Sequence, residues 1–548
     1  MNLKTIIKTA FLACLVAVSF SAAADNVTVN TARAIANGFI KSHAKATPGS
    51  LMAPATADIL LAHAEPSSKV ANANVYYIFN IKGGGFVIVS GDDNAAPVLG
   101  YSDKGQIDVN HLSEGLSALL EGYKCDIEYL QTHKIATSQS VQSTMMTATS
   151  IVEPMLKTTW GPEDPYNYQC PTLNGKYSKV GCGGVCMAQA IKFWEYPTSM
   201  DSLPSYYGGY LGATVPALPP TTFDFSKMIP SYSHWNFATK SIVFETYTEE
   251  QMQEVAKLCR YCGQSIKMNY SPSLSMTTYG KLPAMKSFGY NSKAVNYNRT
   301  SFSDETWRQM MHKELDEGRP IMYAAYGSSS VGHAFLVDGY DSEEYYHMNM
   351  GWFGYNDGWY LITAIIFVNR YGENRNYYTK HSMIVGLEPP LFCTINTEVT
   401  ADGELFLLGD TFTPQAVDVN LSMSYRTLPF MFSLTDAQGN EVALSESITL
   451  NRLTFENGSD ISLALALPEN LPEGTYDLHL NYRTGDSEPL TQAVTAEGQL
   501  YVVGKFAKFG APFGISDVID AVDILLVDNS GRIGVDDLTS LIDFLLDE

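Results

Sequence analysis

The hydrophobic pattern of the chain changes at the dipeptide Pro389–Pro390. Residues 151–390 mix helix-like and strand-like segments, whereas residues 391–505 carry only short alternating segments separated by turns. At about 100 to 200 residues per domain, a chain of 548 residues is expected to form several domains. The alternating region is typical of a β-sandwich, and the mixed region predicts a separate α+β domain.

Composition excludes several classes of protein. With 45% hydrophobic and 17% charged residues, the chain has ample apolar surface to bury, which excludes wholesale disorder. The net charge of -23 repels phosphate backbones, so we expect no nucleic-acid partner. Eight cysteines are too few for a disulfide scaffold, and no pair of Cys-x-x-Cys units is present for a structural zinc site. We expect no cofactor.

Residues 1–24 have the layout of a bacterial-type signal peptide. Lys4 and Lys8 precede the apolar run Ala10–Phe20, and small residues at 22–24 follow it. We therefore expect a secreted protein, either extracellular or associated with the cell surface. No later segment approaches the roughly 20 apolar residues that a membrane helix needs, so no membrane span is expected.

Residues 25–148 are predicted to form a small α+β unit followed by a linker. The predicted helices and strands are, in order, Ala32–His43, Val75–Ile81, Phe86–Ser90 and Leu112–Thr132. The two strand segments flank Gly83–Gly85, which predicts a hairpin. Residues 135–150 are rich in Ser, Thr and Met and lack periodicity and turn residues, which predicts an exposed, cleavable linker.

Cys182 lies where a nucleophile is expected. It follows Gly181 at the start of the apolar-periodic segment Cys182–Trp194, which predicts a helix. The positive end of the helix dipole stabilises a thiolate at that position. For this motif taken alone, a buried packing cysteine remains the alternative.

Two alternating segments further along supply partners for such a nucleophile. Residues 332–340 and 345–352 are joined by a polar turn, so they are expected to pair antiparallel. A turn centred near residues 341–342 sets His333 beside Asn349. The amide then holds the imidazole in one tautomer while the ring takes the thiol proton, as in a cysteine peptidase.

His347 is the rival for the role of general base. The same register sets it opposite Phe335, further from the open end of the hairpin. His234, His312 and His381 have no comparable setting, so structural or surface roles are expected for them.

The tail, residues 506–548, is predicted to form two short amphipathic helices. Between them, a glycine at the sixth place and an acid at the twelfth are typical of an EF-hand-like calcium loop. Asp528, Ser530 and Asp537 remain as candidate ligands, but the first ligand position is Leu526, which removes a carboxylate. A metal-free helical hairpin is the favoured interpretation. The segment resembles a degenerate half of a dockerin repeat.

Several motifs together resemble the streptopain family of papain-like cysteine peptidases. These motifs are Gly-Cys182-x-x-x-x-Met-Ala-Gln, Lys192–Pro197, Gly332–Phe335, Asn349-x-Gly-Trp352 and Trp160–Asn167. The segment Phe86–Asp92, with Pro97–Tyr101, resembles the inhibitory propeptide of that family. By this resemblance Cys182 is the nucleophile, His333 the general base and Asn349 the orienting residue. The resemblance also implies protein or peptide substrates, with the chain's own propeptide as inhibitor.

The resemblance implies an α+β fold class. A papain-like two-subdomain peptidase, residues 149–390, is expected to follow an α+β propeptide with its linker, residues 25–148. An Ig-like β-sandwich, residues 391–505, and the helical dockerin-like tail, residues 506–548, complete the chain. These two C-terminal parts are candidates for binding a surface or a protein partner.

The chain departs from the family pattern near the expected oxyanion site. The substrate-binding or oxyanion region comprises Trp160, Pro162 and Trp352. The family's oxyanion glutamine is replaced by Pro162, which has no donor, and the tryptophan after the orienting asparagine is replaced by Met350. Loss of one oxyanion donor typically lowers the rate by about 100- to 1000-fold, so a slow peptidase is expected.

The sequence thus predicts a secreted cysteine endopeptidase made as a zymogen. The alternative is a catalytically weakened peptidase-fold protein that binds peptides or serves in surface assembly.

Overall fold

The structure is a computed structural model. It describes residues 26–46, 58–133, 150–277, 279–291, 293–326, 332–362, 380–390, 392–395, 399–422, 428–450, 455, 458–483, 490–493, 498–527 and 531–547. The predicted signal peptide and nearly all of the predicted linker lie outside these residues. Within the described part of the chain, no helix combines the length and the apolarity needed to cross a membrane.

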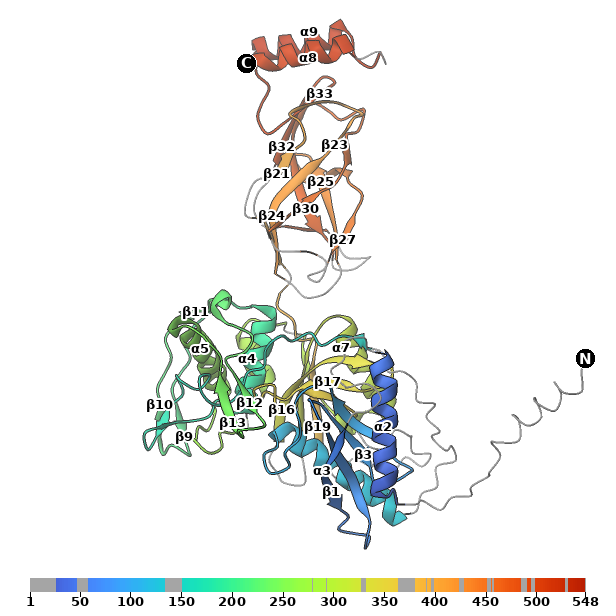
Figure 1. The fold of residues 1–548 in the computed structure, drawn as a ribbon. Coiled ribbons are helices and arrows are strands. Elements are labelled where there is room, and N and C mark those ends of the chain that lie inside the picture. Colours follow the sequence, from blue (N-terminus) through green and yellow to red (C-terminus); the bar gives the residue numbers. More distant parts are fainter. Residues whose placement is uncertain are drawn as a thin grey trace, which may run out of the picture.

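One large sheet runs through the N-terminal and central parts of the chain (Figure 1). Among the described residues it has 11 strands, in the order β1-β2-β3-β4-β18-β17-β16-β15-β19-β14, and β5 pairs with β16. Their bounds are β1 (Ile59–Pro66), β2 (Asn74–Ile81), β3 (Phe86–Ser90), β4 (Val98–Ser102), β5 (Ser150–Val152), β14 (Val295–Asn298), β15 (Ile321–Tyr326), β16 (Gly332–Asp341), β17 (Tyr346–Asn349), β18 (Gly358–Tyr360) and β19 (Lys380–Val385). Because β4 pairs with β18, strands from both sides of the predicted linker form one continuous sheet.

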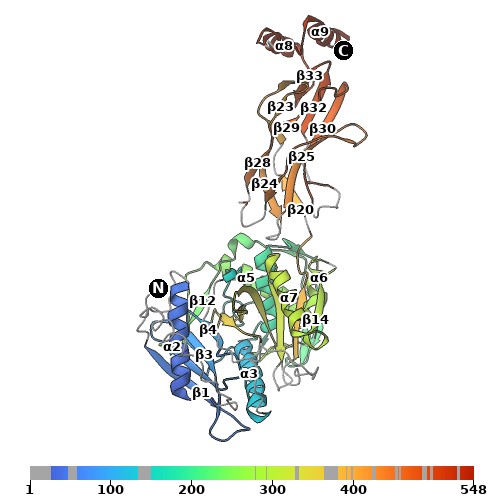
Figure 2. The same ribbon diagram turned by 90° about the vertical axis from the view of Figure 1, so that its right-hand side faces the viewer.

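Helices pack against this sheet, and several two-stranded sheets of short strands are separate from it. The helices are α2 (Val29–Ala46), α3 (Glu114–His133), α4 (Cys182–Trp194), α5 (Glu249–Ser265), α6 (Lys281–Ser287) and α7 (Asp304–Asp316), with the 3-10 turns η1 (Phe225–Lys227) and η2 (Arg299–Ser301). The short strands are β6 (Thr172–Leu173), β7 (Lys176–Tyr177), β8 (Ser199–Met200), β9 (Tyr206–Gly208), β10 (Ala213–Val215), β11 (Thr221–Thr222), β12 (Ser233–Asn236) and β13 (Ser241–Phe244). Figure 2 shows α2 and α3 beside the N-terminal strands.

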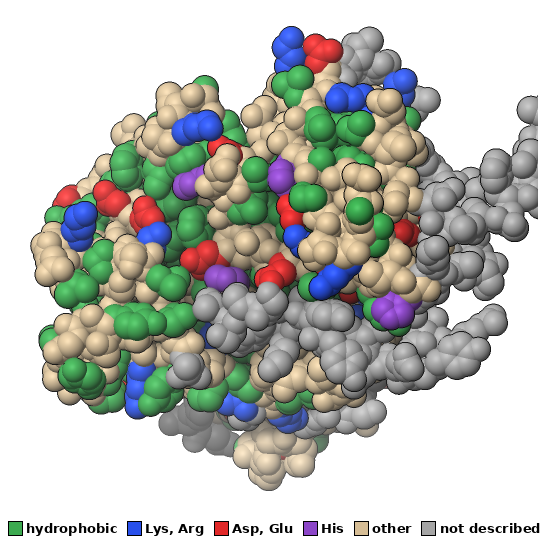
Figure 3. All heavy atoms as spheres, turned by 90° about the horizontal axis from the view of Figure 1, so that it is seen from below, with side chains coloured by type: hydrophobic (Ala, Val, Ile, Leu, Met, Phe, Trp, Pro, Cys, Tyr) green, Lys and Arg blue, Asp and Glu red, His purple; other side chains and the backbone are tan. Residues whose placement is uncertain are grey.

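The predicted N-terminal elements are confirmed. Strands β2 and β3 form the antiparallel hairpin around Gly83–Gly85, with Ile78 opposite Ile88. Helices α2 and α3 cover the two segments predicted to be helical. On the face that Figure 3 shows, acidic and basic side chains are interspersed, so the acidic excess does not gather into one patch there.

Side chains of β15 and β16 alternate between two cores, because successive residues of a strand point to opposite faces. Tyr323 and Phe335 belong to the core that contains α2, α3 and α7. Met322 and Leu336 belong to the core around α4 and α5. The sheet therefore separates the N-terminal helices from the helix that begins at Cys182.

The helix predicted from Cys182 is confirmed as α4. It ends where Glu195 takes a left-handed conformation with a φ of 51°, and Pro197 follows, which cannot continue a helix. Helix α5 begins at a capping box in which Thr248 and Gln251 each bond the other's backbone N–H.

The register of the β16–β17 hairpin differs from the prediction. Asn349 pairs with Leu336, three residues further along β16 than His333, and His347 pairs with Gly339 rather than Phe335. The predicted pairing of His333 with Asn349 across this hairpin is therefore wrong.

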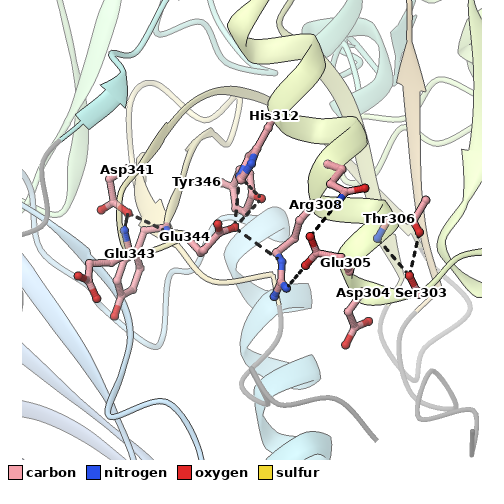
Figure 4. Close-up of polar contacts among 12 residues, drawn as sticks. Ser303, Asp304, Glu305, Thr306, Arg308, His312, Asp341, Glu343, Glu344 and Tyr346 are labelled. Atoms are coloured by element: carbon pink, nitrogen blue, oxygen red, sulfur yellow. Dashed lines mark hydrogen bonds and ion pairs between the residues drawn. The ribbon is translucent and has the colours of Figure 1, made fainter. Parts of the chain in front are cut away.

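The turn between the two strands gives the physical reason. The Asp341 side chain accepts hydrogen bonds from the backbone N–H groups of Glu343 and Tyr345, both at 2.9 Å, so it opens the turn and does not form its centre. Glu344 on the far side of the turn pairs with His312 of α7 at 3.2 Å (Figure 4). A bulge between Val337 and Gly339 shifts the pairing again.

Among the described residues after 391, two larger sheets and one two-stranded sheet are formed. One has the order β20-β24-β21 with β28 beside β24, and the other has the order β22-β33-β32-β30-β25-β26 with β27 and β31 at its sides; β23 pairs with β29. Their bounds are β20 (Phe392–Ile395), β21 (Val399–Ala401), β22 (Leu405–Leu407), β23 (Thr411–Phe412), β24 (Pro414–Ser422), β25 (Leu428–Thr435), β26 (Glu441–Leu444), β27 (Ile448–Leu450), β28 (Ser459–Ser462), β29 (Leu465–Ala466), β30 (Gly474–Tyr482), β31 (Thr491–Gln492), β32 (Gly498–Val503) and β33 (Phe506–Phe509). The two sheets share one core, to which Val419 and Phe432 contribute.

The tail forms the helices α8 (Ile515–Val527) and α9 (Val535–Asp547). Strand β33 extends the larger sheet past the expected boundary at residue 505, and its Phe506 shares a small core with both helices. An aspartate side chain caps the start of each helix. The Asp517 carboxylate accepts the backbone N–H of Gly514, and the Asp537 carboxylate accepts the backbone N–H of Gly534.

Candidate active site

Cys182 is half-buried at the first position of α4. The preceding Gly181 has a φ of 81°, a conformation that glycine adopts without strain. A Cβ atom at position 181 would lie 2.6 Å from Met268 Cε and 3.0 Å from the carbonyl oxygen of Ser275. Both the backbone conformation and the close packing therefore require glycine before the candidate nucleophile.

The segment around Pro162 borders the start of α4. The Val180 N–H donates to the Pro162 carbonyl oxygen at 2.8 Å, only two residues before Cys182. Trp160 is completely buried, and its indole N–H donates to the Ile229 carbonyl oxygen at 3.0 Å. The Trp160 ring is therefore part of the core, whereas the Pro162 backbone lies next to the nucleophile's turn.

Trp352 is half-buried and linked to the same segment through a lysine. The Lys179 ammonium nitrogen lies 5.4 Å from the centroid of the Trp352 ring and 2.7 Å from a carboxylate oxygen of Glu163. The ion pair engages the Glu163 carboxylate as an acceptor. Glu163 is thus poorly suited to donate a hydrogen bond to an oxyanion.

His333 meets Cys182, although it does not pair with Asn349 across the hairpin. A ring nitrogen of His333, the Cys182 sulfur and a carboxylate oxygen of Glu114 all lie within 4.8 Å of one another. His333 Nδ1 lies 3.0 Å from Glu114 Oε2, and the side chain is 15% exposed. Because Glu114 belongs to α3, the N-terminal domain reaches directly into the candidate site.

The surroundings of His333 favour its charged form. Burial acts to lower its pKa, but hydrogen bonds and charges from Cys182 and Glu114 outweigh burial and raise the pKa to about 9. At neutral pH the ring is therefore an imidazolium between two acidic groups.

Asn349 is held by other partners. Its Nδ2 donates to the Thr158 carbonyl oxygen at 2.7 Å, and its Oδ1 accepts from Gln189 Nε2 at 2.9 Å and from the Gly351 N–H at 3.0 Å. The hydrogen bonds among the described residues do not join Asn349 to His333. The amide is fixed in place but is not engaged with the imidazole in the uncleaved chain.

Gln189 contacts Asn349, although the sequence analysis named this glutamine only as part of a motif and assigned it no role. It is 1% exposed, donates to Asn349, and accepts the Trp160 backbone N–H at 3.1 Å through Oε1. It lies seven residues after Cys182, which is two helical turns, so both side chains occupy one face of α4. That spacing was the available signal. Glu114, by contrast, comes from a distant helix and has no local signature in the sequence.

Replacing Gln189 by glutamate is expected to lower kcat about 10- to 100-fold with little change in KM, because a carboxylate oxygen would then oppose Asn349 Oδ1. Glutamate still accepts the Trp160 N–H, so the variant tests the Asn349 bond alone. The measurement is steady-state hydrolysis of a peptide substrate beside thermal unfolding. Gln189→Met, which loses both bonds, is the matched control. A glutamate variant with wild-type kcat would contradict the positioning role.

The rival base and the remaining histidines have other partners. His347 Nδ1 lies 2.6 Å from Asp338 Oδ1, and His312 stacks on the Tyr340 ring. The His381 ring bonds the Tyr323 hydroxyl at 2.6 Å, and burial lowers the pKa of His381 to about 3. His234 pairs with Glu245 at the surface. These contacts fit the structural or surface roles expected for the rings.

The candidate calcium ligands are only partly within the described residues. Asp528 and Ser530 lie outside them. Asp537 Oδ2 accepts the Gly534 N–H at 2.8 Å and lies 3.7 Å from the Lys505 ammonium nitrogen. The described part of the loop therefore shows Asp537 as a helix cap.

A cavity of about 610 Å³ lies between the N-terminal domain and the central domain. Tyr101 and Lys104 line it from one side, and Asn349, His347 and Asp357 line it from the other. Asn349 therefore sits at the boundary of the two domains.

The chain is similar to known proteins in two regions. Residues 160–360 match the model of the peptidase C10 family, and residues 24–127 match the model of the Spi protease inhibitor. Streptopain of Streptococcus pyogenes serotype M28 is 28% identical over 360 residues, which cover 61% of this chain and 85% of that protein. The thiol protease/hemagglutinin PrtT of Porphyromonas gingivalis is 23% identical over 434 residues, which cover 75% of this chain and 48% of that protein.

Among solved structures, a fragment of prointerpain A from Prevotella intermedia is similar to 60% of this chain and 98% of its own, with 23% identity and a TM-score of 0.46. Active interpain A from the same organism is similar to 43% of this chain, with 27% identity and a TM-score of 0.35. The two family models cover the N-terminal domain and the peptidase region in the order that the motifs predicted. Residues 160–360 thus match a divergent, streptopain-like peptidase C10 domain, and a Spi-type inhibitor domain, residues 24–127, precedes it.

Proposed function

We propose that this chain is the secreted zymogen of a cysteine endopeptidase that hydrolyses peptide bonds through Cys182, His333 and Asn349. The observation that carries the proposal is the meeting of Cys182, at the positive end of α4, with a protonated His333. A thiolate beside an imidazolium is the resting form of an activated cysteine nucleophile.

In the proposed reaction, the Cys182 sulfur attacks the substrate carbonyl carbon and forms a tetrahedral intermediate. The Cys182 backbone N–H at the helix start stabilises the oxyanion. His333 gives its proton to the leaving amine, then takes a proton from water, and the hydroxide so formed releases the acyl group from sulfur. Asn349 orients the His333 ring once the chain has been cleaved.

Latency is proposed to depend on Glu114. The Glu114 carboxylate oxygen Oε2 lies 3.0 Å from Nδ1 of the His333 ring, while Asn349 is hydrogen-bonded to Gln189 and Thr158. Removal of the N-terminal domain frees the ring for Asn349. Strand β5 (Ser150–Val152) remains paired with β16 and so begins the mature peptidase, which agrees with cleavage in the linker before it.

The remaining features of the proposal come from the sequence and the family. Signal-peptide cleavage after residue 24 sends the chain to the exterior or the cell surface. The substrates are proteins or peptides with an apolar residue just upstream of the cleaved bond. The two sheets after residue 391 form an Ig-like sandwich that, with the dockerin-like tail, binds a surface or a protein partner.

A catalytically weakened protein that binds peptides or serves in assembly is the second candidate. The observation that favours it is Pro162, which places no side-chain donor beside the turn that leads to Cys182.

Incubation of the pure full-length chain separates the two candidates. A peptidase is expected to shorten itself by losing residues 25 to about 148, detected by N-terminal sequencing, and its Cys182 is expected to react rapidly with an epoxide inhibitor. Cys182→Ala is expected to stay intact. Equal maturation of that variant in pure solution would assign the cleavage to another protease, and slow epoxide labelling after maturation would favour the binding protein.

A further inference from the structure

Three metal-ligand side chains from three separate elements meet at the start of α4. The Cys182 sulfur, a His333 ring nitrogen and a Glu114 carboxylate oxygen lie within 4.8 Å of one another, and all three residues are half-buried. Cys182 and His333 belong to the peptidase domain, whereas Glu114 comes from α3 of the inhibitor domain. The set is therefore complete only while the inhibitor domain is docked.

This combination of groups suits zinc. Thiolate, imidazole and carboxylate are its usual protein ligands, and a site with three of them and a water is common. Ligand distances of about 2.0 to 2.3 Å place neighbouring ligand atoms of a tetrahedral site roughly 3.3 to 3.6 Å apart. The Glu114 Oε2 to His333 Nδ1 distance is 3.0 Å, and all three ligand atoms lie within 4.8 Å of one another, so side-chain rotations would bring them to these distances.

We propose that the uncleaved chain binds one Zn²⁺ through Cys182, His333 and Glu114, and that the bound ion adds to the latency of the zymogen. On binding, the Cys182 sulfur and one His333 ring nitrogen each give up any proton they hold and donate a lone pair to the metal. Coordinated sulfur is no longer free to attack a carbonyl carbon. Loss of the inhibitor domain removes Glu114, so the mature enzyme keeps two ligands and binds the ion more weakly.

The regulatory meaning rests on the proposed peptidase function, but the binding itself does not. The experiment titrates the metal-free full-length chain with Zn²⁺ alone by calorimetry, in the cold, with a gel to show that the chain stays uncleaved. One ion per chain is expected. Cys182→Ala, His333→Ala and Glu114→Gln are each expected to weaken binding at least about tenfold, because even partners of a metal ligand typically contribute 10- to 100-fold.

The matched control is Glu121→Gln, which removes a carboxylate two turns further along α3 and is expected to leave the affinity unchanged. Cobalt(II) provides a second readout, since a thiolate-to-metal absorption band should appear in the wild type and be absent in Cys182→Ala. Wild-type affinity in Glu114→Gln, or equal affinity in the cleaved enzyme, would overturn the proposal. A failure of the peptidase function gives a different result in the labelling experiment. In that case the metal-free, processed chain does not react with the epoxide.

Discussion

Replacing His333 by alanine is expected to lower kcat for peptide hydrolysis by about 100- to 10,000-fold, the range that a general acid–base group contributes. His333 is the imidazole that lies beside the Cys182 sulfur, so its loss removes both the proton acceptor for the thiol and the donor for the leaving amine. The measurement is steady-state hydrolysis by the mature enzyme, with self-processing of the full-length chain as a second assay.

The control for this substitution is His347→Gln. The amide keeps a hydrogen-bond donor for Asp338, whose carboxylate lies 2.6 Å from the His347 ring, so the variant is expected to fold and to retain most activity. If His347→Gln abolished turnover while His333→Ala kept it, the general base would be His347 and the assignment would be wrong.

A stability measurement tests the protonation state of His333 in the uncleaved chain. Its pKa there is about 9 against an ordinary value of 6.5. A raised pKa means that the folded state binds the proton more tightly, so this stabilising contribution is fully present below pH 6.5 and is lost as the pH rises through about 9. In the His333→Ala variant, the free energy of unfolding should lose that part of its pH dependence.

Local patterns in the sequence were sufficient for the elements that carry the site. The apolar periodicity near Cys182 to Trp194 predicted α4, and the two β-rich runs that flank Gly83–Gly85 predicted the β2–β3 hairpin. These predictions succeed because the spacing of apolar residues within a helix or strand indicates which face packs against the core.

The contacts between distant segments were not predictable in the same way. The register of β16 against β17 depends on the Asp341 side chain, which opens the turn by accepting two backbone N–H groups, and on the bulge between Val337 and Gly339. The turn was placed too early along the chain, which gave Asn349 the partner His333 in place of Leu336. The contact of Glu114 with His333 joins residues 219 positions apart, and nothing in the sequence near Glu114 marks it. Such contacts are set by how the two domains dock, which periodicity does not encode.

Replacing Pro162 by glutamine is expected to raise kcat by about 10- to 1000-fold with little change in KM. A tetrahedral intermediate needs two hydrogen-bond donors on its oxygen, and the Cys182 backbone N–H supplies one. Among the neighbours, Glu163 is engaged by Lys179 at 2.7 Å, so it does not replace the missing donor. A glutamine amide at position 162 would form its bond mainly in the transition state, which is why the gain belongs in kcat.

The structure makes this substitution feasible at the backbone. The Pro162 carbonyl oxygen accepts the Val180 N–H at 2.8 Å, and glutamine preserves that bond while it adds a donor beside the helix start. Proline also fixes its own φ angle, so Pro162→Ala is the control that removes the ring without supplying a donor. An increase in kcat for glutamine but not for alanine would identify the added amide as the cause. If both variants fold and neither exceeds the wild type, another group already completes the oxyanion site, and the slow-peptidase interpretation of Pro162 fails.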